Sequence, residues 1–226
     1  VQRVVRPDQS FRGYSGQIAA GVVRPGDEIV VLPSGQRSQV TRIVTYDGDL
    51  AYAFAPLCVT LCIADDMDIS RGDMIVHPKN LPHVERSVEA MVVWMSDQPL
   101  TVAKTYLVKH GSAVVKGSCA EIQYRVDPNT LRRDEGTQLG LNDIGRARFS
   151  FFKPLFVDEY QRSRQTGSFI VIDPLTNVTV GAAMVIARAG ADQVSRQGAQ
   201  ETVSRDIAWQ RSKVTPDDRA RLLRQQ

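Results

Sequence analysis

Hydrophobic residues occur in short runs along the first third of the chain, and residues with turn chemistry separate the runs. In residues 22–50, VVRPGDEIVVLPSGQRSQVTRIVTYDGDL, each break carries a Gly beside Asp, Ser or Pro. Glycine takes positive φ without steric cost, and short Asp or Ser side chains bond nearby backbone amides. The runs between the breaks have the length of hairpin strands, about 4–8 residues. This pattern predicts antiparallel β-sheet.

Five short strands are predicted before residue 77. In residues 58–63, CVTLCI, the three aliphatic side chains face one way and the two cysteines and Thr60 face the other. The turn PGDEIV at residues 25–30 is echoed by RGDMIV at residues 71–76, which we interpret as one turn geometry used twice. The predicted strands are residues 17–23, 28–32, 39–46, 58–63 and 74–76.

A second β-rich block follows the segment KNLPH, residues 79–83, which we interpret as a domain boundary. Residues 88–95 form a nearly continuous apolar run and predict a strand buried on both faces. Further strands are predicted at residues 119–126, 146–151, 169–172 and 178–186. Many short strands at this spacing indicate a barrel or sandwich, and no segment before residue 190 has a helical period.

Alternation assigns an inward face to two strands of this block. In the first strand Ala120, Ile122, Tyr124 and Val126 share one face, opposite Glu121, Gln123 and Arg125. In the second strand Ala147, Phe149 and Phe151 are inward and Arg146, Arg148 and Ser150 are outward.

After Arg188 the sequence becomes polar and aperiodic, which is typical of a linker. The segment VTPDDRARLLRQQ then resembles a helix start, since Thr215 can cap it and Pro216 suits the first helical position. Trp209 precedes this start, and neither predicted β-block needs it, because the strand pattern is complete by residue 186.

The composition is ordinary for a globular protein, with 226 residues, 42% hydrophobic and 23% charged, and a net charge of +3. This charge permits an anionic partner without requiring one. No apolar run approaches the ~18 residues of a membrane span. The first residues lack an initiator Met and an apolar signal region, so we expect a piece of a longer chain without a signal peptide. Three cysteines without framework spacing favour a reducing compartment.

Two short stretches resemble functional motifs, a phosphate loop and an RGD tripeptide, but turn chemistry explains both. A phosphate loop needs GxxxxGK[ST], and the nearest string is GSAVVKGS at residues 111–118, where Lys116 and Gly117 are transposed. We interpret that string as a hairpin turn. The RGD tripeptide at residues 71–73 is likewise explained by turn chemistry.

Cysteine and histidine offer little catalytic or metal chemistry. Cys58 and Cys62 are four residues apart, and His77 and His83 could in principle complete a zinc set, but the spacing favours buried structural thiols. His110 precedes Gly111 and is interpreted as a solvated turn residue. No Ser–His–Asp or Cys–His arrangement can be argued. We expect no catalytic, cofactor or metal residue in this chain.

Arginines gather in pairs in the second block. They form either a solvated outer face or a contact surface for a protein or an anion, and aromatic interleaving for single-stranded nucleic acid is weak. The loop with Arg162 and Arg164 is the candidate partner contact. The pairs are Arg132 and Arg133, Arg146 and Arg148, and Arg162 and Arg164.

The sequence also carries a specific resemblance from residue 1 to about residue 188. The stretch FRGYSGQIAAGVVRPGDEIVVLPSG resembles the second domain of a translation-factor-type GTPase, and more narrowly the large subunit of bacterial sulfate adenylyltransferase. ADDMDISRGDMIV, YRVDPNTLRRDE, LNDIGRARFSF and TGSFIVIDPLTNVTVGAAMV are similar to that subunit in the same order.

The resemblance implies an all-β fold of two translation-factor-like β-barrels in tandem, followed by a linker and a short helical tail. The implied domains are residues 1–80, residues 85–190 and a segment 191–226 that leads into an adenylylsulfate kinase. The family's phosphate loop and NKxD lie in an N-terminal domain that these residues do not include. GTP, ATP and magnesium therefore belong to the parent protein and no cofactor to this chain.

The implied parent couples GTP hydrolysis to adenylylsulfate synthesis, and a small partner subunit transfers the adenylyl group. The expected partners are that subunit and the GTPase and kinase domains in cis, in the cytoplasm, with no membrane or nucleic acid. The alternative is the tRNA-binding barrels of an elongation or release factor, because the same fold serves both. An unrelated barrel scaffold is a third reading.

Overall fold

The computed structural model describes residues 1–188 except 9–10, 129, 131 and 137. All regular elements among these residues are strands, as predicted. The described residues contain no helix that could cross a membrane. The predicted linker and helical tail, with Trp209 and Thr215, lie outside the described residues. By its contacts, Val1–Ala189 forms one compact unit.

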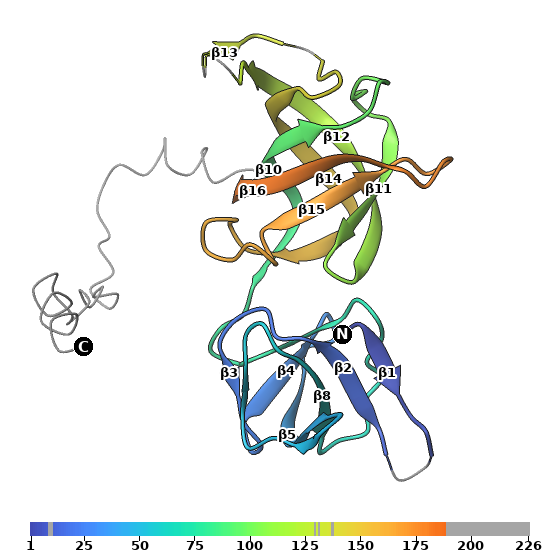
Figure 1. Ribbon diagram of the computed structural model, residues 1–226, viewed down its shortest axis with the longest axis vertical. Helices are drawn as coiled ribbons and strands as arrows, with labels where there is room; N and C mark the ends of the chain where they lie inside the picture. The colour runs from blue at the N-terminus through green and yellow to red at the C-terminus, as the bar shows by residue number, and fades with distance from the viewer. Residues whose placement is uncertain (9–10, 129, 131, 137, 189–226) are drawn as a thin grey trace, which may run out of the picture. The chain divides into compact units, whose positions relative to one another are not determined.

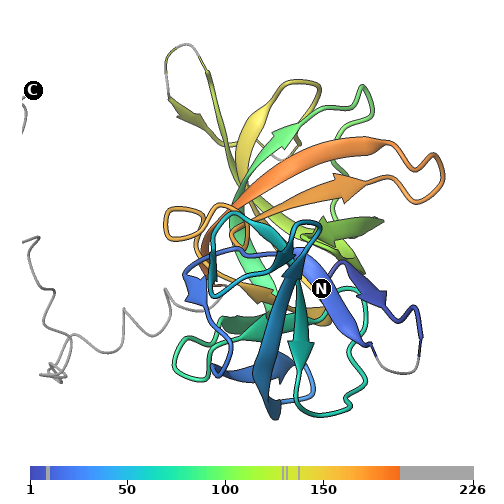
Figure 2. The same cartoon turned by 60° about the horizontal axis from the view of Figure 1, so that its bottom comes forward.

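The first β-domain is built on a curved sheet whose path is open (Figure 2). Its two ends are brought together by Val1, whose carbonyl accepts from the amide of Gly72 at 2.9 Å and whose nitrogen bonds the carbonyl of Asp73. The sheet order is β1 (Arg3–Val5), β2 (Gly13–Gln17), β8 (Cys58–Ile63), β5 (Gln36–Thr45), β4 (Glu28–Leu32) and β9 (Met74–Val76), with β6 (Gly48–Asp49) on β5, while β3 (Val22–Val23) pairs with β7 (Ala53–Phe54).

Two turns of this domain share one geometry, which confirms the interpretation of the repeated motif. In each turn the first amide donates to the carboxylate of the fourth residue at 2.7 Å, and the fourth amide donates back to the first carbonyl at 3.1 Å. The third residue is a glycine at positive φ, 94° for Gly26 and 101° for Gly72. The turns comprise residues 24–27 and 70–73, so the RGD tripeptide has a turn role.

The second β-domain is a closed barrel of six antiparallel strands (Figure 1). The ring closes where β11 pairs with β12. The predicted connector, residues 79–83, follows β9 and ends at His83, the first residue of β10. The ring order is β11 (Thr105–His110), β15 (Ser168–Ile172), β16 (Thr179–Arg188), β10 (His83–Trp94), β14 (Ile144–Val157) and β12 (Ala113–Val126), with β13 (Arg133–Asp134) on β12.

The barrel interior holds one continuous apolar core. Phe149 and Phe151 of β14 point inward and meet Phe169 of β15 edge to face, at ring-centre distances of 5.4 and 5.6 Å. Trp94 and Tyr106 pack in the same manner at 5.7 Å. The predicted inward face of residues 146–151 is confirmed.

Three strand predictions were wrong in detail. Residues 17–23 are not one strand, because β2 ends at Gln17 and Gly21, at φ 78°, turns the chain before β3. Ala120 is exposed and Cys119 is buried, because a bulge between Cys119 and Glu121 shifts the register by one residue. The strand β11 and the first half of β12 were not predicted as strands, although the turn between them was interpreted as a hairpin turn, and this hairpin closes the barrel.

Candidate functional site

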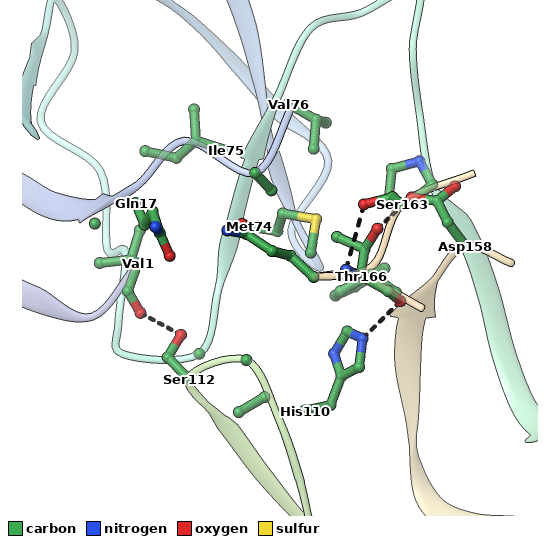
Figure 3. A pocket seen from close by; sticks show the side chains of 18 of the residues that line it. Val1, Gln17, Met74, Ile75, Val76, His110, Ser112, Asp158, Ser163 and Thr166 are labelled. Carbon is green, nitrogen blue, oxygen red and sulfur yellow. Dashed lines mark hydrogen bonds between the residues drawn. The ribbon is translucent and has the colours of Figure 1, made fainter. Parts of the chain in front are cut away.

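One hollow in the described part of the chain has a volume of about 1320 Å³ and is lined by residues of both β-domains. Figure 3 shows it between Val1 and the strand β9 on one side and the residues around His110 and Thr166 on the other. The β11–β12 turn reaches the first domain, where the hydroxyl of Ser112 donates to the carbonyl of Val1 at 2.7 Å. A Cβ on Gly72 would lie 3.3 Å from the Cα of Ala113, so glycine permits this close approach.

His110 lies in the wall of this cavity and is 5% exposed, so its interpretation as a solvated turn residue was wrong. It is the last residue of β11, and the alternation of Tyr106, Val108 and His110 points all three side chains inward. This alternation is visible in the sequence and could have identified His110 as buried.

The hydrogen bond of His110 fixes the state of its ring. Nε2 lies 2.9 Å from the carbonyl of Thr166, which can only accept, so Nε2 carries the proton. Burial lowers the pKa of His110 and so favours the neutral ring, while this hydrogen bond and Asp158 act in the opposite direction. Figure 3 shows the other ring nitrogen turned away from Thr166, toward the cavity, where it can accept a hydrogen bond.

The loop of residues 158–167 is held by its own polar groups. Asp158 accepts from the hydroxyl of Thr166 at 2.7 Å, and the amide of Gly167 donates to the carbonyl of Ser163 at 2.8 Å. Gly167 packs directly under the backbone of Tyr160, where a Cβ has no room. The cavity therefore has a preformed wall at this loop.

The structure separates the two arginines of the candidate partner contact. The guanidinium of Arg162 reaches Asn80, in the segment between β9 and β10, with 3.4 Å between Nη2 and Oδ1. Arg164 is exposed, and its carbonyl accepts from the hydroxyl of Ser168 at 2.7 Å. Arg162 thus contacts the chain itself, while Arg164 presents its charge to solvent.

Arg146 and Arg148 surround a carboxylate that the sequence analysis missed. Glu89 points outward from β10 but is only 4% exposed, because Arg146 covers it and Arg148 and Gln123 bond it at 3.1 and 2.9 Å. Burial alone would raise the pKa of Glu89, but the hydrogen bonds from these three groups outweigh it and lower the pKa. A glutamate inside the apolar run of residues 88–95 was the available signal.

One member of the remaining basic pair lies beside this cluster. Arg133 of β13 stacks over the ring of Tyr124 at 4.7 Å, and Tyr124 of β12 is the register partner of Arg146 in β14. Arg148 also pairs with Glu121 at 3.3 Å. Local carboxylates therefore neutralise much of the positive charge on the outer face of β12 and β14.

The other candidate motifs have structural roles. Residues 111–118 form the β11–β12 turn and the start of β12, with Gly111 at φ 55°, as the hairpin interpretation predicted. Cys62 is buried as predicted, whereas Cys58 is exposed at the start of β8. Within the described part of the chain, no group of three or more His, Cys, Asp or Glu side chains is placed to hold a metal ion. The cavity walls present hydrogen-bonding groups beside apolar side chains.

The fold is shared with translation-factor-type GTPases. A structure of Sup35 complexed with GDP superimposes with a TM-score of 0.74 at 20% identity, covering 83% of this chain and 46% of Sup35. Residues 87–186 match the family described as GTP-eEF1A C-terminal domain-like. The two β-domains thus have the architecture of the barrels in such proteins.

The sequence comparisons confirm the narrower resemblance, because the chain is a relative of sulfate adenylyltransferase subunit 1. It is 46% identical to that subunit of Bacteroides fragilis over 83% of this chain, and 48% identical to that of Sulfurovum sp. over 82%. It is 47% identical to the bifunctional enzyme CysN/CysC of Rhodopirellula baltica over 97% of this chain. The chain spans 34% of the bifunctional relative and 40% of the other two.

Proposed function

We propose that this chain forms the two barrels of the GTPase subunit of a sulfate adenylyltransferase. The parent protein couples GTP hydrolysis to the synthesis of adenylylsulfate from ATP and sulfate. The observation that carries the proposal is the identity of 46% and 48% with two proteins named sulfate adenylyltransferase subunit 1, over more than four fifths of the chain. Barrel folds alone serve many functions, so the identity decides between them.

Within the parent, these barrels are the structural and partner-contact part. GTP, ATP and magnesium bind in other parts of the assembly, and the small subunit carries out adenylyl transfer. The exposed Arg164 is a candidate contact for that subunit, whereas Arg162 supports the loop through Asn80. We place the assembly in the cytoplasm, since its substrates are ATP and GTP.

The parent continues into an adenylylsulfate kinase. Support comes from the extent of the matches, which is 97% of this chain for the bifunctional relative but 82–83% for two separate subunits. The longer match therefore includes residues beyond 189. The kinase would phosphorylate the adenylylsulfate that the first activity makes. The parent gene should encode a GxxxxGK[ST] within roughly 30 residues after Gln226, the scale of one βα unit.

A second candidate function is tRNA binding, as in an elongation or release factor. The likeness to Sup35 favours it, but at 20% identity this likeness supports the fold alone. The internally paired arginines around Glu89 also leave little free positive charge for RNA on that face. RNA binding with a steep salt dependence would favour this candidate.

The test is an assay of the whole parent protein with its small subunit. We expect adenylylsulfate formation from ATP and sulfate to rise when GTP is added, and not with a non-hydrolysable analogue. Formation that is indifferent to GTP would contradict the proposal. Calorimetry of residues 1–226 with a GTP analogue and magnesium is the companion measurement, and micromolar binding there would contradict the assignment of GTP to another domain.

A further inference from the structure

The strand β9 lies at the end of the sheet path in the first β-domain, and its outer edge has backbone groups to offer. In the neighbouring strand β4, the carbonyl of Val31 accepts from the amide of Gly35 at 2.7 Å, so the backbone groups of Val31 face β5. Ile75 of β9 is the register partner of Val31. Members of such an antiparallel pair direct their N–H and C=O away from each other. Those of Ile75 therefore point away from β4, to a side where β9 has no partner strand in the described part of the chain.

The two turns of shared geometry show what belongs at this edge, because each turn bonds a valine in the same way. The glycine of the turn donates its amide to the carbonyl of the valine, and the nitrogen of the valine bonds the carbonyl of the aspartate that follows the glycine. The valine is Val40 in the first turn, with distances of 2.7 and 2.9 Å. In the second turn it is Val1, whose carbonyl lies 2.9 Å from the glycine amide. This pattern is a glycine β-bulge in an antiparallel pair.

The residues before Val40 continue the pairing that the bulge begins. They run antiparallel to β4, and the second of them, Ser38, lies opposite Ile29. The string GDEIV of the first turn is matched by GDMIV of the second, so Ile75 occupies the place of Ile29. By the same geometry, the second residue before Val1 would lie opposite Ile75 and meet its free N–H and C=O.

Burial also indicates that β9 lacks a cover that β4 has. Ile29 is 4% exposed, whereas Ile75 and both of its neighbours in β9 are only half-buried. Figure 3 shows β9 and Val1 in the wall of the hollow between the two β-domains. The hollow, at about 1320 Å³, exceeds the ~300–1000 Å³ of a small-molecule pocket. A segment of polypeptide fits this space better than a small ligand does.

We propose that the residues immediately before Val1 in the parent protein form a strand that pairs antiparallel with β9 and closes the first β-domain. This rests on the proposed function, in which the GTPase domain precedes Val1. The second residue before Val1 should be small or apolar, because the equivalent Ser38 is only 9% exposed. A strand of another molecule can also pair with a free edge, but the residue before Val1 is held beside β9 by its own peptide bond.

The proposed strand would tie the GTPase domain to both β-domains. Its end, Val1, accepts at one carbonyl from the amide of Gly72 at 2.9 Å and from the hydroxyl of Ser112 at 2.7 Å. Gly72 belongs to the first β-domain and Ser112 to the second. A linker that is paired as a strand has less freedom than a flexible one, so it restricts the orientation of the domain that precedes it.

The first experiment measures hydrogen exchange at the Ile75 amide by mass spectrometry, in the full-length parent protein and in the chain of residues 1–226. Exchange should be at least about 100-fold slower in the parent, because there the amide donates to the added strand. The matched control is the amide of Ile29, which is paired with Ser38 in both proteins and should be protected in both.

A cysteine cross-link in the full-length parent identifies the strand that covers β9. With a cysteine at the first residue before Val1 and Cys58→Ser to remove an exposed thiol, Met74→Cys should form a disulfide on mild oxidation. The two residues would be directly opposite, with Cα atoms roughly 4.5–5.5 Å apart. Val76→Cys is the matched control, since it lies two residues further along β9 and beyond the ~7 Å that a disulfide spans.

The outcomes separate this proposal from the proposed function. If Ile75 exchanges rapidly in the parent while GTP stimulates adenylylsulfate synthesis, the strand proposal is wrong and the function stands. If Ile75 is protected and Met74→Cys cross-links but GTP has no effect, the strand stands and the function fails. Protection that is lost on dilution, or disulfides between two chains, would assign the edge to a second copy and overturn the proposal. Protection without the Met74→Cys cross-link would mean that another part of the parent covers β9, which also overturns it.

Discussion

The two β-domains enclose their apolar cores in different ways. The second closes its hydrogen-bonded ring and encloses a single core that contains Trp94, Tyr106 and three phenylalanines. The first leaves its sheet path open, and its core divides into two smaller clusters made mostly of aliphatic residues. Closure of a sheet removes its edges and creates an interior that large side chains can fill.

In the open domain, polar contacts supplement the smaller apolar clusters. Arg12 pairs with Asp66 and lies 3.6 Å from Asp68, while its guanidinium covers the ring of Tyr14 at 5.7 Å. The hydroxyl of Tyr14 donates to the carbonyl of Met67 at 2.9 Å. We therefore expect the largest losses in the free energy of unfolding from truncation of buried apolar side chains in the second domain. In the first domain, we expect the loss of a single buried hydrogen bond to cause a measurable loss.

The largest effect is expected from Phe149→Ala in the closed barrel. Phe149 is fully buried, and its removal should lower the free energy of unfolding by about 3–5 kcal/mol, because a cavity remains in a rigid core. Phe152→Ala on the same strand is the control, since Phe152 is 62% exposed, and its cost should stay within about 0.5 kcal/mol. Similar losses for both variants in denaturant titrations would contradict the assigned face.

A smaller loss is expected from Glu89→Ala on the outside of the same barrel. Arg146 would lose its buried partner but is partly hydrated, so the loss should be about 2 kcal/mol rather than that of a sealed pair. Glu121→Ala is the control, because Glu121 is half exposed, and should cost less than about 0.5 kcal/mol.

The Glu89→Ala effect should also depend on pH. Because the folded-state pKa of Glu89 is lowered, its contribution is present above the ordinary carboxylate pKa and disappears as pH falls through the folded value. Urea titrations should therefore show a constant difference between the two proteins from neutral pH down to about pH 4.5, and the two should converge only in more acidic solutions. A difference that grows in acid would refute the charge-pair explanation.

In the open domain, Tyr14→Phe removes one buried hydrogen bond and little volume. The expected loss is about 1 kcal/mol, because the carbonyl of Met67 loses its donor while the ring packing is kept. Tyr46→Phe serves as the matched control, since Tyr46 is fully exposed. If thermal melts of the two variants coincide with that of the unaltered protein, the polar tie contributes nothing.

The smallest expected effect is on the pH dependence of the free energy of unfolding, to which His110 contributes. Its pKa is lowered in the folded state, so the unfolded chain binds more protons and stability falls as pH drops through the ordinary histidine value. His110→Gln keeps a donor toward Thr166 and should flatten the profile between about pH 7.5 and 5.5. A His110→Gln profile parallel to that of the unaltered protein would contradict the buried neutral ring.

The sequence by itself determined the class of fold and much of its local detail. Three predicted strands have the bounds that the structure gives, namely β4, β8 and β9, because each is a short run between strong turn signals. The shared turn geometry of residues 24–27 and 70–73 followed from Gly and Asp alone. Such features depend on residues within a few positions of one another, which is the range over which a sequence pattern acts.

Only the tertiary structure decided which strands meet and what the odd residues do. The pairing of β10 with β16 joins residues more than 85 positions apart, and the bulge at Cys119 depends on the register with β14. Glu89 was missed and His110 was interpreted as a turn residue. Local patterns could signal their burial, but the partners that bond them, Arg146 and Thr166, lie 57 and 56 positions away. The separate positions of Arg162 and Arg164 were decided in the same way, since burial depends on neighbours distant in sequence.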